Sequence, residues 1–240
     1  MKFQFLNNGL PVEVDFADED VERIFIPLLE RLSEMQKQKG GRILVMLAAP
    51  PGAGKSTLAA FLSELADQRG MQPITVIGMD GFHRYQEDLL SHYTVRDGET
   101  ISLVQIKGAP ETFDLKKLTE RVQRVAAGEC LGWPAYDRLL HNPVEDQVTV
   151  EGDIVLLEGN YLLLDEPGWR DLSDYADYTI FLKAPLSLLQ GRLVERQIAS
   201  GKEPDKARQF VEKSDLYNAR TVLDHSKPAD LVMDAGGMNM

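Results

Sequence analysis

Short apolar runs, bounded by glycine, proline or charged residues, are the most regular feature of the hydrophobic pattern of this chain. They lie at residues 42–48, 73–78, 153–158, 178–182 and 231–233. Polar residues are scarce within most of them, which is typical of strands that are buried on both faces, as in parallel sheets. The runs therefore predict a central parallel sheet.

Segments with apolar residues at every third or fourth position lie between these runs and predict helices. They cover residues 18–37, about 56–68, 114–127, 184–200, 206–214 and 215–223. Pro27 predicts a kink or a late start in the first helix, and Thr112 or Asp114 is the expected N-cap of the 114–127 helix. Elsewhere we expect edge strands at 12–16 and 148–150, a short helix near 86–90 in an irregular stretch, and a loop over 132–144.

The alternation of strands and helices, without repeats or a clear linker, predicts an α/β fold with a doubly wound parallel sheet. We expect a single domain over residues 1–240, in which residues 1–40 add an N-terminal strand and helix. Ligands in such folds bind at the carboxyl ends of the strands. Side chains that directly follow the strands at 42–48, 73–78 and 153–158 are therefore expected to meet at one edge.

Residues 49–57, of sequence APPGAGKST, join the first predicted strand to a predicted helix. A strand, a glycine-rich turn ending in Gly-Lys-Ser, and a helix form the context of a phosphate-binding P-loop. Ala49 stands where the full pattern has glycine, which costs little if its φ is negative. A chance Gly-Lys turn is the alternative. The residues expected to bind the nucleotide are Pro51, Gly52, Ala53, Gly54, Lys55, Ser56 and Thr57.

Each part of this turn has a physical role in binding a nucleoside triphosphate. Gly52 and Gly54 allow the backbone to wrap around phosphate oxygens with its N–H groups pointing inward, and the helix start adds the positive end of its dipole. Lys55 reaches the β- and γ-phosphates, and the Ser56 hydroxyl can bind Mg²⁺. The expected ligands are ATP and Mg²⁺.

Two carboxylates follow predicted strands. Asp80, after the strand at 73–78, can accept or orient the proton of an attacking hydroxyl, although an aspartate before Gly81 is also a common turn residue. Glu158 ends the strand at 153–158 and resembles the Walker-B acid, which holds Mg²⁺ directly or through water. The alternative for Glu158 is an ordinary charged strand end.

Further candidate residues lie on a helix and in loops. Arg192 and Arg196 are four residues apart and share one helix face, where they can close over the phosphates or simply face solvent. His83, Lys107, Tyr136, Arg138 and His141 carry groups that suit a small polar or anionic acceptor, and surface-loop composition is the competing interpretation.

Several motifs occur here in an order that resembles the superfamily of phosphoribulokinase, uridine kinase and bacterial pantothenate kinase. They are the P-loop and the segments at 80–83, 107–114, 134–138 and 158–165. The resemblance covers about residues 40–235. The match is nearest to the fructokinase-like and nucleoside or nucleotide kinase-like bacterial branch.

This resemblance implies a three-layer P-loop fold with lid helices over about 185–215 and ATP-dependent phosphorylation of a small-molecule hydroxyl. It also implies the base role of Asp80, a place for Glu158 near Mg²⁺, an acceptor contact from Asn218, and a homodimer. Ile106 stands before Lys107 where pantothenate kinases have arginine, so the acceptor stays open.

Composition excludes some functions. The formal net charge of −12 argues against a nucleic-acid partner, because phosphate backbones favour basic surfaces. The single cysteine, Cys130, excludes an intramolecular disulfide, and no apolar stretch is long enough to predict a membrane span. A cytoplasmic location, where ATP and Mg²⁺ are abundant, is expected.

Two functional hypotheses follow from the sequence. The first is a kinase that transfers the γ-phosphate of ATP to the hydroxyl of a small molecule such as a sugar, a nucleoside or a pantothenate-like metabolite. The alternative is a nucleotide-dependent regulatory ATPase that makes no phosphorylated product. Release of ADP that depends on an acceptor distinguishes the first from the second.

Overall fold

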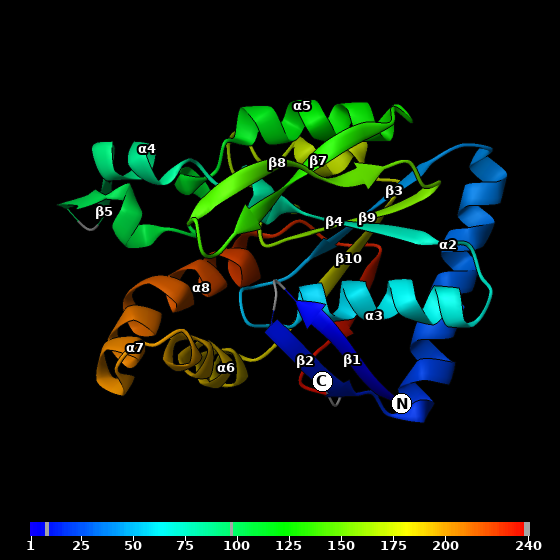
Figure 1. Cartoon of the computed structure of the whole chain (residues 1–240), viewed down its shortest axis with the longest axis horizontal. Helices are drawn as coiled ribbons and strands as arrows, with labels where there is room; N and C mark the ends of the chain where they lie inside the picture. The colour runs from blue at the N-terminus through cyan, green and yellow to red at the C-terminus, as the bar shows by residue number, and fades with distance from the viewer. Residues whose placement is uncertain (8–9, 97, 238–240) are drawn as a thin grey trace.

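The computed structural model describes residues 1–7, 10–96 and 98–237. Its centre is a parallel sheet in the order β11-β10-β3-β9-β4, with helices on both faces (Figure 1). The strands are β3 (Ile43–Ala48), β4 (Ile74–Gly78), β9 (Ile154–Gly159), β10 (Tyr178–Lys183) and β11 (Leu231–Asp234). The five apolar runs in the sequence are therefore the five strands of the predicted doubly wound sheet.

Successive side chains of β3 enter two separate cores. Val45 and Leu47 pack on one face with α2 (Ile26–Lys39), α3 (Lys55–Gln68) and α6 (Leu186–Ala199). Leu44 and Met46 pack on the other face with α5 (Leu115–Ala126). All six residues of β3 are buried, which explains why this strand is apolar throughout.

The amino-terminal region forms a hairpin and an interrupted helix. β1 (Lys2–Asn7) pairs antiparallel with β2 (Leu10–Asp15), and the buried Phe16 packs against Phe61 of α3. The predicted edge strand at 12–16 is thus half of a hairpin. The predicted helix at 18–37 consists of α1 (Asp18–Asp20), a π-helical turn η1 (Val21–Phe25) and α2. Pro27 lies in the first turn of α2, where its missing N–H costs least.

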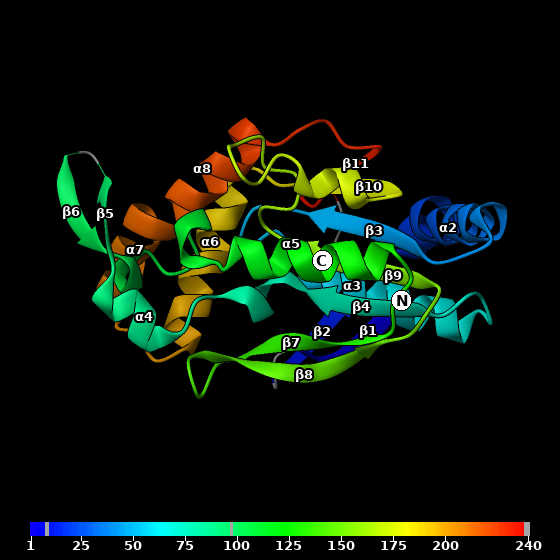
Figure 2. The same cartoon turned by 90° about the horizontal axis from the view of Figure 1, so that it is seen from above.

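Helices gather at one end of the sheet, beyond the carboxyl end of β3 (Figure 2). They are α4 (Gln86–Ser91), α6, α7 (Pro204–Phe210) and α8 (Leu216–His225), with the π-helical turn η6 (Val211–Asp215) between α7 and α8. A small hairpin of β5 (Tyr93–Arg96) and β6 (Glu99–Ser102) projects at this end. Short 3₁₀ turns complete the chain: η2 (Met79–Phe82), η3 (Leu103–Ile106), η4 (Pro110–Thr112) and η5 (Leu172–Tyr175).

The predicted loop over 132–144 is wrong. β7 (Leu131–Asp137) and β8 (Asn142–Val150) form an antiparallel hairpin, and only the short turn between them is irregular. Trp133 is 1% exposed and its indole N–H donates to the Gly78 carbonyl at 2.8 Å, which fixes the hairpin to the end of β4. Pro134 coincides with a register shift in the ladder, so the proline that suggested a loop marks an irregular point in a strand.

The other helix boundaries agree closely with the sequence prediction. The carboxylate of Asp114 accepts from the Lys117 N–H at 3.0 Å and is the N-cap of α5, whereas Thr112 belongs to the preceding turn. In the described part of the chain, every helix falls short of the length or the apolarity that a membrane crossing requires.

Candidate active site

The turn between β3 and α3 has the backbone of a phosphate-binding loop. Gly52 and Gly54 have φ values of +83° and +97°, the left-handed region that glycine adopts without strain. The Ala53 N–H closes the turn onto the Pro50 carbonyl at 3.2 Å, and α3 begins at Lys55. Among the described residues, positive φ outside glycine is confined to His141 and Asp146, so alanine at position 49 is unstrained. Pro51 lies in this turn, and Ser56 and Thr57 follow Lys55 in the first turn of α3.

Glu158 faces the start of α3 from the neighbouring strand. β9 pairs with both β3 and β4, which sets Glu158 opposite Leu47 and Gly78 at the carboxyl ends of all three strands. The Ser56 hydroxyl donates to Oε1 of Glu158 at 2.9 Å, and the Lys55 ammonium lies 4.0 Å from Oε2. Burial and the nearby Asp80 charge raise the pKa of Glu158, while Lys55 and Ser56 oppose that rise. The two oxygen-bearing side chains form a pair that suits a hard divalent cation.

Asp80 lies in η2, directly after β4. Burial disfavours its charged form, but His83, Lys55 and two arginines (Arg138 and Arg196) outweigh burial and lower the pKa of the carboxyl below its usual value. Asp80 is therefore ionised at neutral pH, as a proton acceptor must be.

Lys55, Asp80 and the arginines share one cleft of about 290 Å³. It is lined by Val14, Gly52, Gly54, Lys55, Ser56, Thr57, Asp80, Arg138, Arg192 and Arg196. Five of these side chains are cationic or anionic and converge from η2, α3, α6 and the turn between β7 and β8, which lie far apart in the sequence. A cleft that is rich in cations and contains glycine backbone suits a polyphosphate.

Helix α6 packs directly on the phosphate-binding turn. A Cβ on Gly52 would lie 3.0 Å from Cγ of Leu193, so this glycine also allows the helix to approach. One guanidinium nitrogen of Arg192 donates to the Ala53 carbonyl at 3.4 Å, and Arg196 lies 4.0 Å from Asp215 of η6. Both arginines are thus brought to the cleft from one helix.

A row of aromatic and basic side chains extends from Asp80 away from the turn. The His83 ring packs between Phe113 and Tyr136, with centroid distances of 4.1 and 5.0 Å, and its Nδ1 lies 2.8 Å from the Asp80 carbonyl oxygen. Burial lowers the pKa of His83 despite the nearby Asp80, so the ring is neutral at neutral pH. The Lys107 ammonium lies 4.9 Å from the centroid of Tyr136.

The remaining predicted acceptor residues occupy different places. His141 contributes its backbone carbonyl, which accepts from Lys107 at 2.8 Å. Asn218 of α8 is 2% exposed, and its Oδ1 has no hydrogen-bond partner among the described residues. Its Nδ2 lies 3.9 Å from the position of a Cβ on Gly108, whose carbonyl accepts from the Tyr161 hydroxyl at 2.6 Å.

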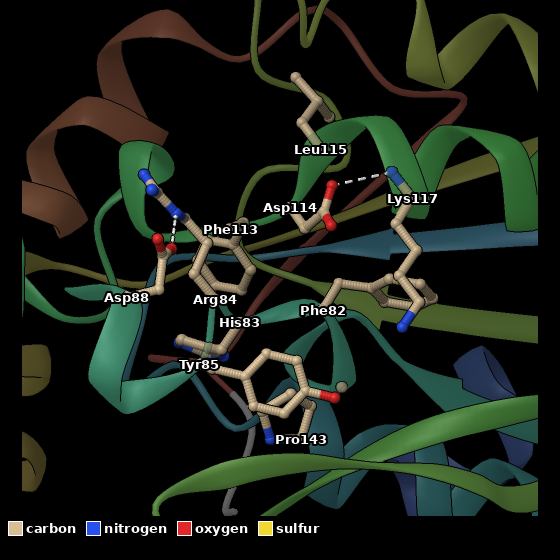
Figure 3. A pocket seen from close by; sticks show the side chains of 11 residues that line it. Phe82, His83, Arg84, Tyr85, Asp88, Phe113, Asp114, Leu115, Lys117 and Pro143 are labelled. Carbon is tan, nitrogen blue, oxygen red and sulfur yellow. Dashed lines mark hydrogen bonds and ion pairs between the residues drawn. The ribbon is translucent and has the colours of Figure 1, made fainter. Parts of the chain in front are cut away.

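A second cavity of about 310 Å³ opens beyond His83, between η2 and the start of α5 (Figure 3). Its two cationic side chains already have acidic partners: Arg84 pairs with Asp88 at 2.5 Å, and Lys117 pairs with Glu145. Its charges are therefore largely neutralised within the protein, unlike those of the cleft at the phosphate-binding turn.

Sequence reasoning missed three residues that shape the site. Val14 of the N-terminal hairpin lines the cleft, and nothing in the local sequence indicates it. Trp133 anchors the β7–β8 hairpin. Gly81 allows that hairpin to approach, because a Cβ there would lie 2.0 Å from the Pro134 carbonyl oxygen. A glycine directly after Asp80 was the one signal that could have indicated a close backbone contact.

Within the described ranges, no three histidine, cysteine, aspartate or glutamate side chains gather closely enough to hold a metal ion by themselves. A cation at Ser56 and Glu158 would therefore need further oxygen ligands from phosphates or water, which is the usual way in which proteins hold Mg²⁺.

The chain is similar to several known proteins along most of its length. It is 41% identical over 236 residues to protein YggC of Escherichia coli (strain K12), covering 98% of this chain and 95% of that one. It is 31% identical to a candidate uridine kinase, C227.14, of Schizosaccharomyces pombe (strain 972 / ATCC 24843), covering 86% and 88% of the two chains.

A solved structure supports the same relationship. The candidate fructose transport system kinase of Silicibacter sp. TM1040 superposes with a TM-score of 0.75 at 34% identity, covering 85% of this chain and 98% of that one. Residues 44–234 match the phosphoribulokinase / uridine kinase family. This match covers the parallel sheet except for Ile43, the phosphate-binding turn, Asp80 and Glu158. The chain is thus a member of the phosphoribulokinase / uridine kinase family of P-loop kinases.

Proposed function

We propose that this protein is an ATP-dependent kinase that transfers the γ-phosphate to a hydroxyl group of a small molecule. The observation that carries the proposal is the convergence of Lys55, Asp80 and three arginines on one cleft at the P-loop. A regulatory ATPase needs the phosphate-binding part of this site. It has no need for an ionised carboxylate flanked by a separate row of polar and aromatic side chains.

The loop amides, Lys55 and the arginines bind the triphosphate and stabilise negative charge that builds on the transferred group. Asp80 accepts the proton from the attacking hydroxyl as the new O–P bond forms and the bond to the β-phosphate oxygen breaks. ADP leaves with the electron pair of that bond. Arg192 and Arg196, within the lid helices at about 185–215, exclude water from the cleft, which limits hydrolysis.

Ser56 and Glu158 fit the family's Mg²⁺, because they present a hydroxyl and a carboxylate oxygen 2.9 Å apart beside the phosphate-binding turn. When bound there, Mg²⁺ neutralises phosphate charge. The Lys55 ammonium lies 4.0 Å from Oε2 of the same Glu158 side chain. We place this activity, carried by one kinase domain, in the cytoplasm.

A panel of sugars, nucleosides and hydroxy acids tests the proposal through ADP release. We expect ADP release that depends on at least one acceptor. Lys55→Ala abolishes it and weakens ATP binding, because the loop loses the cation nearest to the phosphates. Lys116→Ala is the matched control, since the Lys116 side chain is 89% exposed and pairs with Glu120 of its own helix. Full-rate ADP release without any acceptor would favour the ATPase alternative.

A further inference from the structure

Lys107 carries a positive charge that no carboxylate compensates within the described part of the chain. Its ammonium donates to Oε1 of Gln86 and to the carbonyl of His141, both at 2.8 Å, and lies over the Tyr136 ring. All three partners are neutral. Because an ammonium group has three N–H donors, these contacts leave one donor for a ligand.

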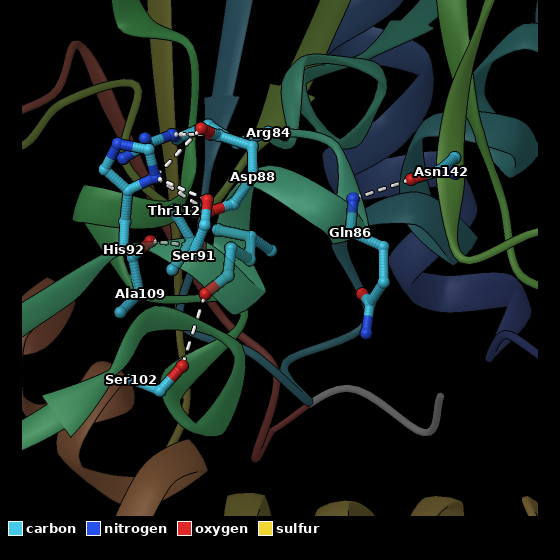
Figure 4. A network of polar contacts seen from close by, with 10 residues as sticks. Arg84, Gln86, Asp88, Ser91, His92, Ser102, Ala109, Thr112 and Asn142 are labelled. Atoms are coloured by element: carbon cyan, nitrogen blue, oxygen red, sulfur yellow. Dashed lines mark hydrogen bonds and ion pairs between the residues drawn. The ribbon is translucent and has the colours of Figure 1, made fainter.

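The partners of Lys107 are themselves held in place. The Gln86 N–H donates to Oδ1 of Asn142 at 2.8 Å, which joins α4 to the start of β8 (Figure 4). His141 has a φ of +52°, an unusual value for a residue other than glycine. The Asp137 carboxylate stabilises this turn, because it accepts hydrogen bonds from the N–H groups of Leu139 and Leu140 at 2.7 and 2.9 Å. The hairpin tip is thus built to present a carbonyl to Lys107.

The ammonium lies on the acceptor side of Asp80. Tyr136 lies near both groups: its ring contacts Lys107, and burial together with the Asp80 charge raises the pKa of its hydroxyl to about 12. Gly108, the next residue along, borders the buried amide of Asn218. A ligand that extends from Asp80 past Tyr136 would therefore meet a cation and an unsatisfied amide oxygen.

Lys107 is partly buried, and this partial burial without a counter-ion lowers the pKa of its ammonium group. A negatively charged ligand would offset this effect. In the second cavity, by contrast, Arg84 and Lys117 are already paired with Asp88 and Glu145. Of these basic side chains, Lys107 is the one left without an acidic partner.

We propose that the phosphate acceptor is a hydroxylated anion, whose carboxylate or phosphate group is bound by Lys107 while its hydroxyl reaches Asp80. This inference rests on the proposed kinase function and names the chemical class of its acceptor. It excludes an uncharged alcohol as the preferred acceptor.

Binding of a simple anion tests the site without knowledge of the acceptor. The P-loop is first saturated with Mg²⁺ and a non-hydrolysable ATP analogue, and the thermal midpoint is then measured against inorganic phosphate and, separately, acetate. We expect at least one of the two to raise the midpoint with concentration, as ligands of the folded state do. A response to phosphate alone indicates a phosphate ester, and a response to acetate indicates a carboxylate.

The decisive comparison is between two lysine variants. Lys107→Gln removes the charge but keeps an N–H donor for the His141 carbonyl, so we expect it to fold and to lose the response to the anion. Lys116→Gln, at an exposed site, keeps the full response. The same response in Lys107→Gln and in the wild type, or no response of the wild type to either anion, would overturn the inference.

Turnover with matched acceptor pairs separates this inference from the kinase proposal. The pairs are D-glycerate and glycerol, pantothenate and pantothenyl alcohol, and ribulose 5-phosphate and ribulose. We expect the charged member to be preferred, and Lys107→Gln to raise its KM roughly 10- to 100-fold with a smaller change in kcat. A neutral alcohol used equally well by wild type and Lys107→Gln contradicts the anion site alone. Anion binding through Lys107 without acceptor-dependent ADP release contradicts the kinase function alone.

Discussion

At the scale of single residues, Asp80 has the charge balance of a proton acceptor. Its carboxyl is surrounded by basic side chains that keep its pKa below the ordinary value in spite of burial. The nearby Glu158 has its pKa moved in the opposite direction, because burial dominates there. Two carboxylates in one site thus differ in proton affinity, which is a common sign that they have different roles.

Asp80→Asn tests the role of this carboxylate. The amide occupies the same volume but cannot accept the hydroxyl proton, so we expect kcat to fall by about 10²–10⁴, the usual effect of removing a general base. ATP affinity, measured by calorimetry, changes little because the P-loop contacts remain. Asp67→Asn, at an exposed position on α3, is the control. Near-normal turnover of the Asp80 variant would show that the carboxylate is not the base.

The lowered pKa of His83 makes the free energy of unfolding depend on pH. Because burial lowers its pKa in the folded state, the unfolded chain binds more protons below about pH 6.5, the ordinary histidine pKa. The contribution of His83 to the free energy of unfolding therefore decreases as the pH falls from 7 to 5. We expect His83→Asn, which keeps a donor for the Asp80 carbonyl, to lose less stability than the wild type over this range. Urea denaturation at several pH values measures it, and parallel curves would refute this assignment.

At the scale of elements, the β7–β8 hairpin positions the acceptor side of the site. It presents Tyr136 and Arg138 near Asp80, and the carbonyl of His141 to Lys107. Its attachment depends on the hydrogen bond of Trp133 to Gly78 and on the close approach at Gly81. The position of this hairpin is therefore set by one hydrogen bond from a side chain and by the close approach of two backbones.

Gly81→Ala should separate the hairpin from η2. The added Cβ would lie 2.0 Å from the Pro134 carbonyl oxygen, so one of the two backbones must shift. We expect a loss of stability of about 1–3 kcal/mol, as for an overpacked core, and a large loss of turnover with ATP binding retained. Gly41→Ala is the matched control, because nothing lies within 4 Å of a Cβ there. Equal thermal midpoints for the two variants would contradict this account.

The sequence predicted some elements well and others poorly for identifiable reasons. β3 and β9 were found because they are buried almost throughout, which leaves a continuous apolar signal. β4, β10 and β11 are partly exposed and were found as shorter runs that are mostly apolar. The β7–β8 hairpin was missed because Pro134 and the polar tip resemble a loop, whereas its pairing is set by tertiary contacts of Trp133 and Gly81. The π-helical turns at Val21–Phe25 and Val211–Asp215 were predicted only as parts of ordinary helices, because the spacing of apolar residues does not distinguish the two forms.

Site residues, too, could be predicted where they follow from the order of strands and helices, and not where they depend on tertiary contacts. Lys55, Ser56, Asp80 and Glu158 could be placed together because each follows or begins an element at the carboxyl edge of one sheet. The place of Val14 in the cleft could not be predicted, since it depends on how the N-terminal hairpin packs on α3. The roles of His141 and Gln86 as neutral acceptors for Lys107 depend on backbone and loop geometry in the same way.

At the scale of the whole molecule, the parallel sheet brings the donor-binding turn and both carboxylates to one edge, and helices α6 to α8 lie beyond that edge (Figure 2). The β7–β8 hairpin lies beside this edge of the sheet, and its buried residues belong to the core that contains α5. The hydrogen bond from Lys107 to His141 joins the segment around Lys107 to the hairpin. In the proposed function, donor and acceptor would thus meet at Asp80, as a direct transfer between two bound substrates requires.

The fate of the γ-phosphate tests this account most directly. ATP is incubated with the protein, Mg²⁺ and each acceptor of the panel, and the phosphorus-containing products are followed by ³¹P NMR. The account predicts a phosphate ester that forms in step with ADP for a preferred acceptor, and almost none with Asp80→Asn. Inorganic phosphate that forms at the same rate with or without every acceptor, and no ester, would contradict it.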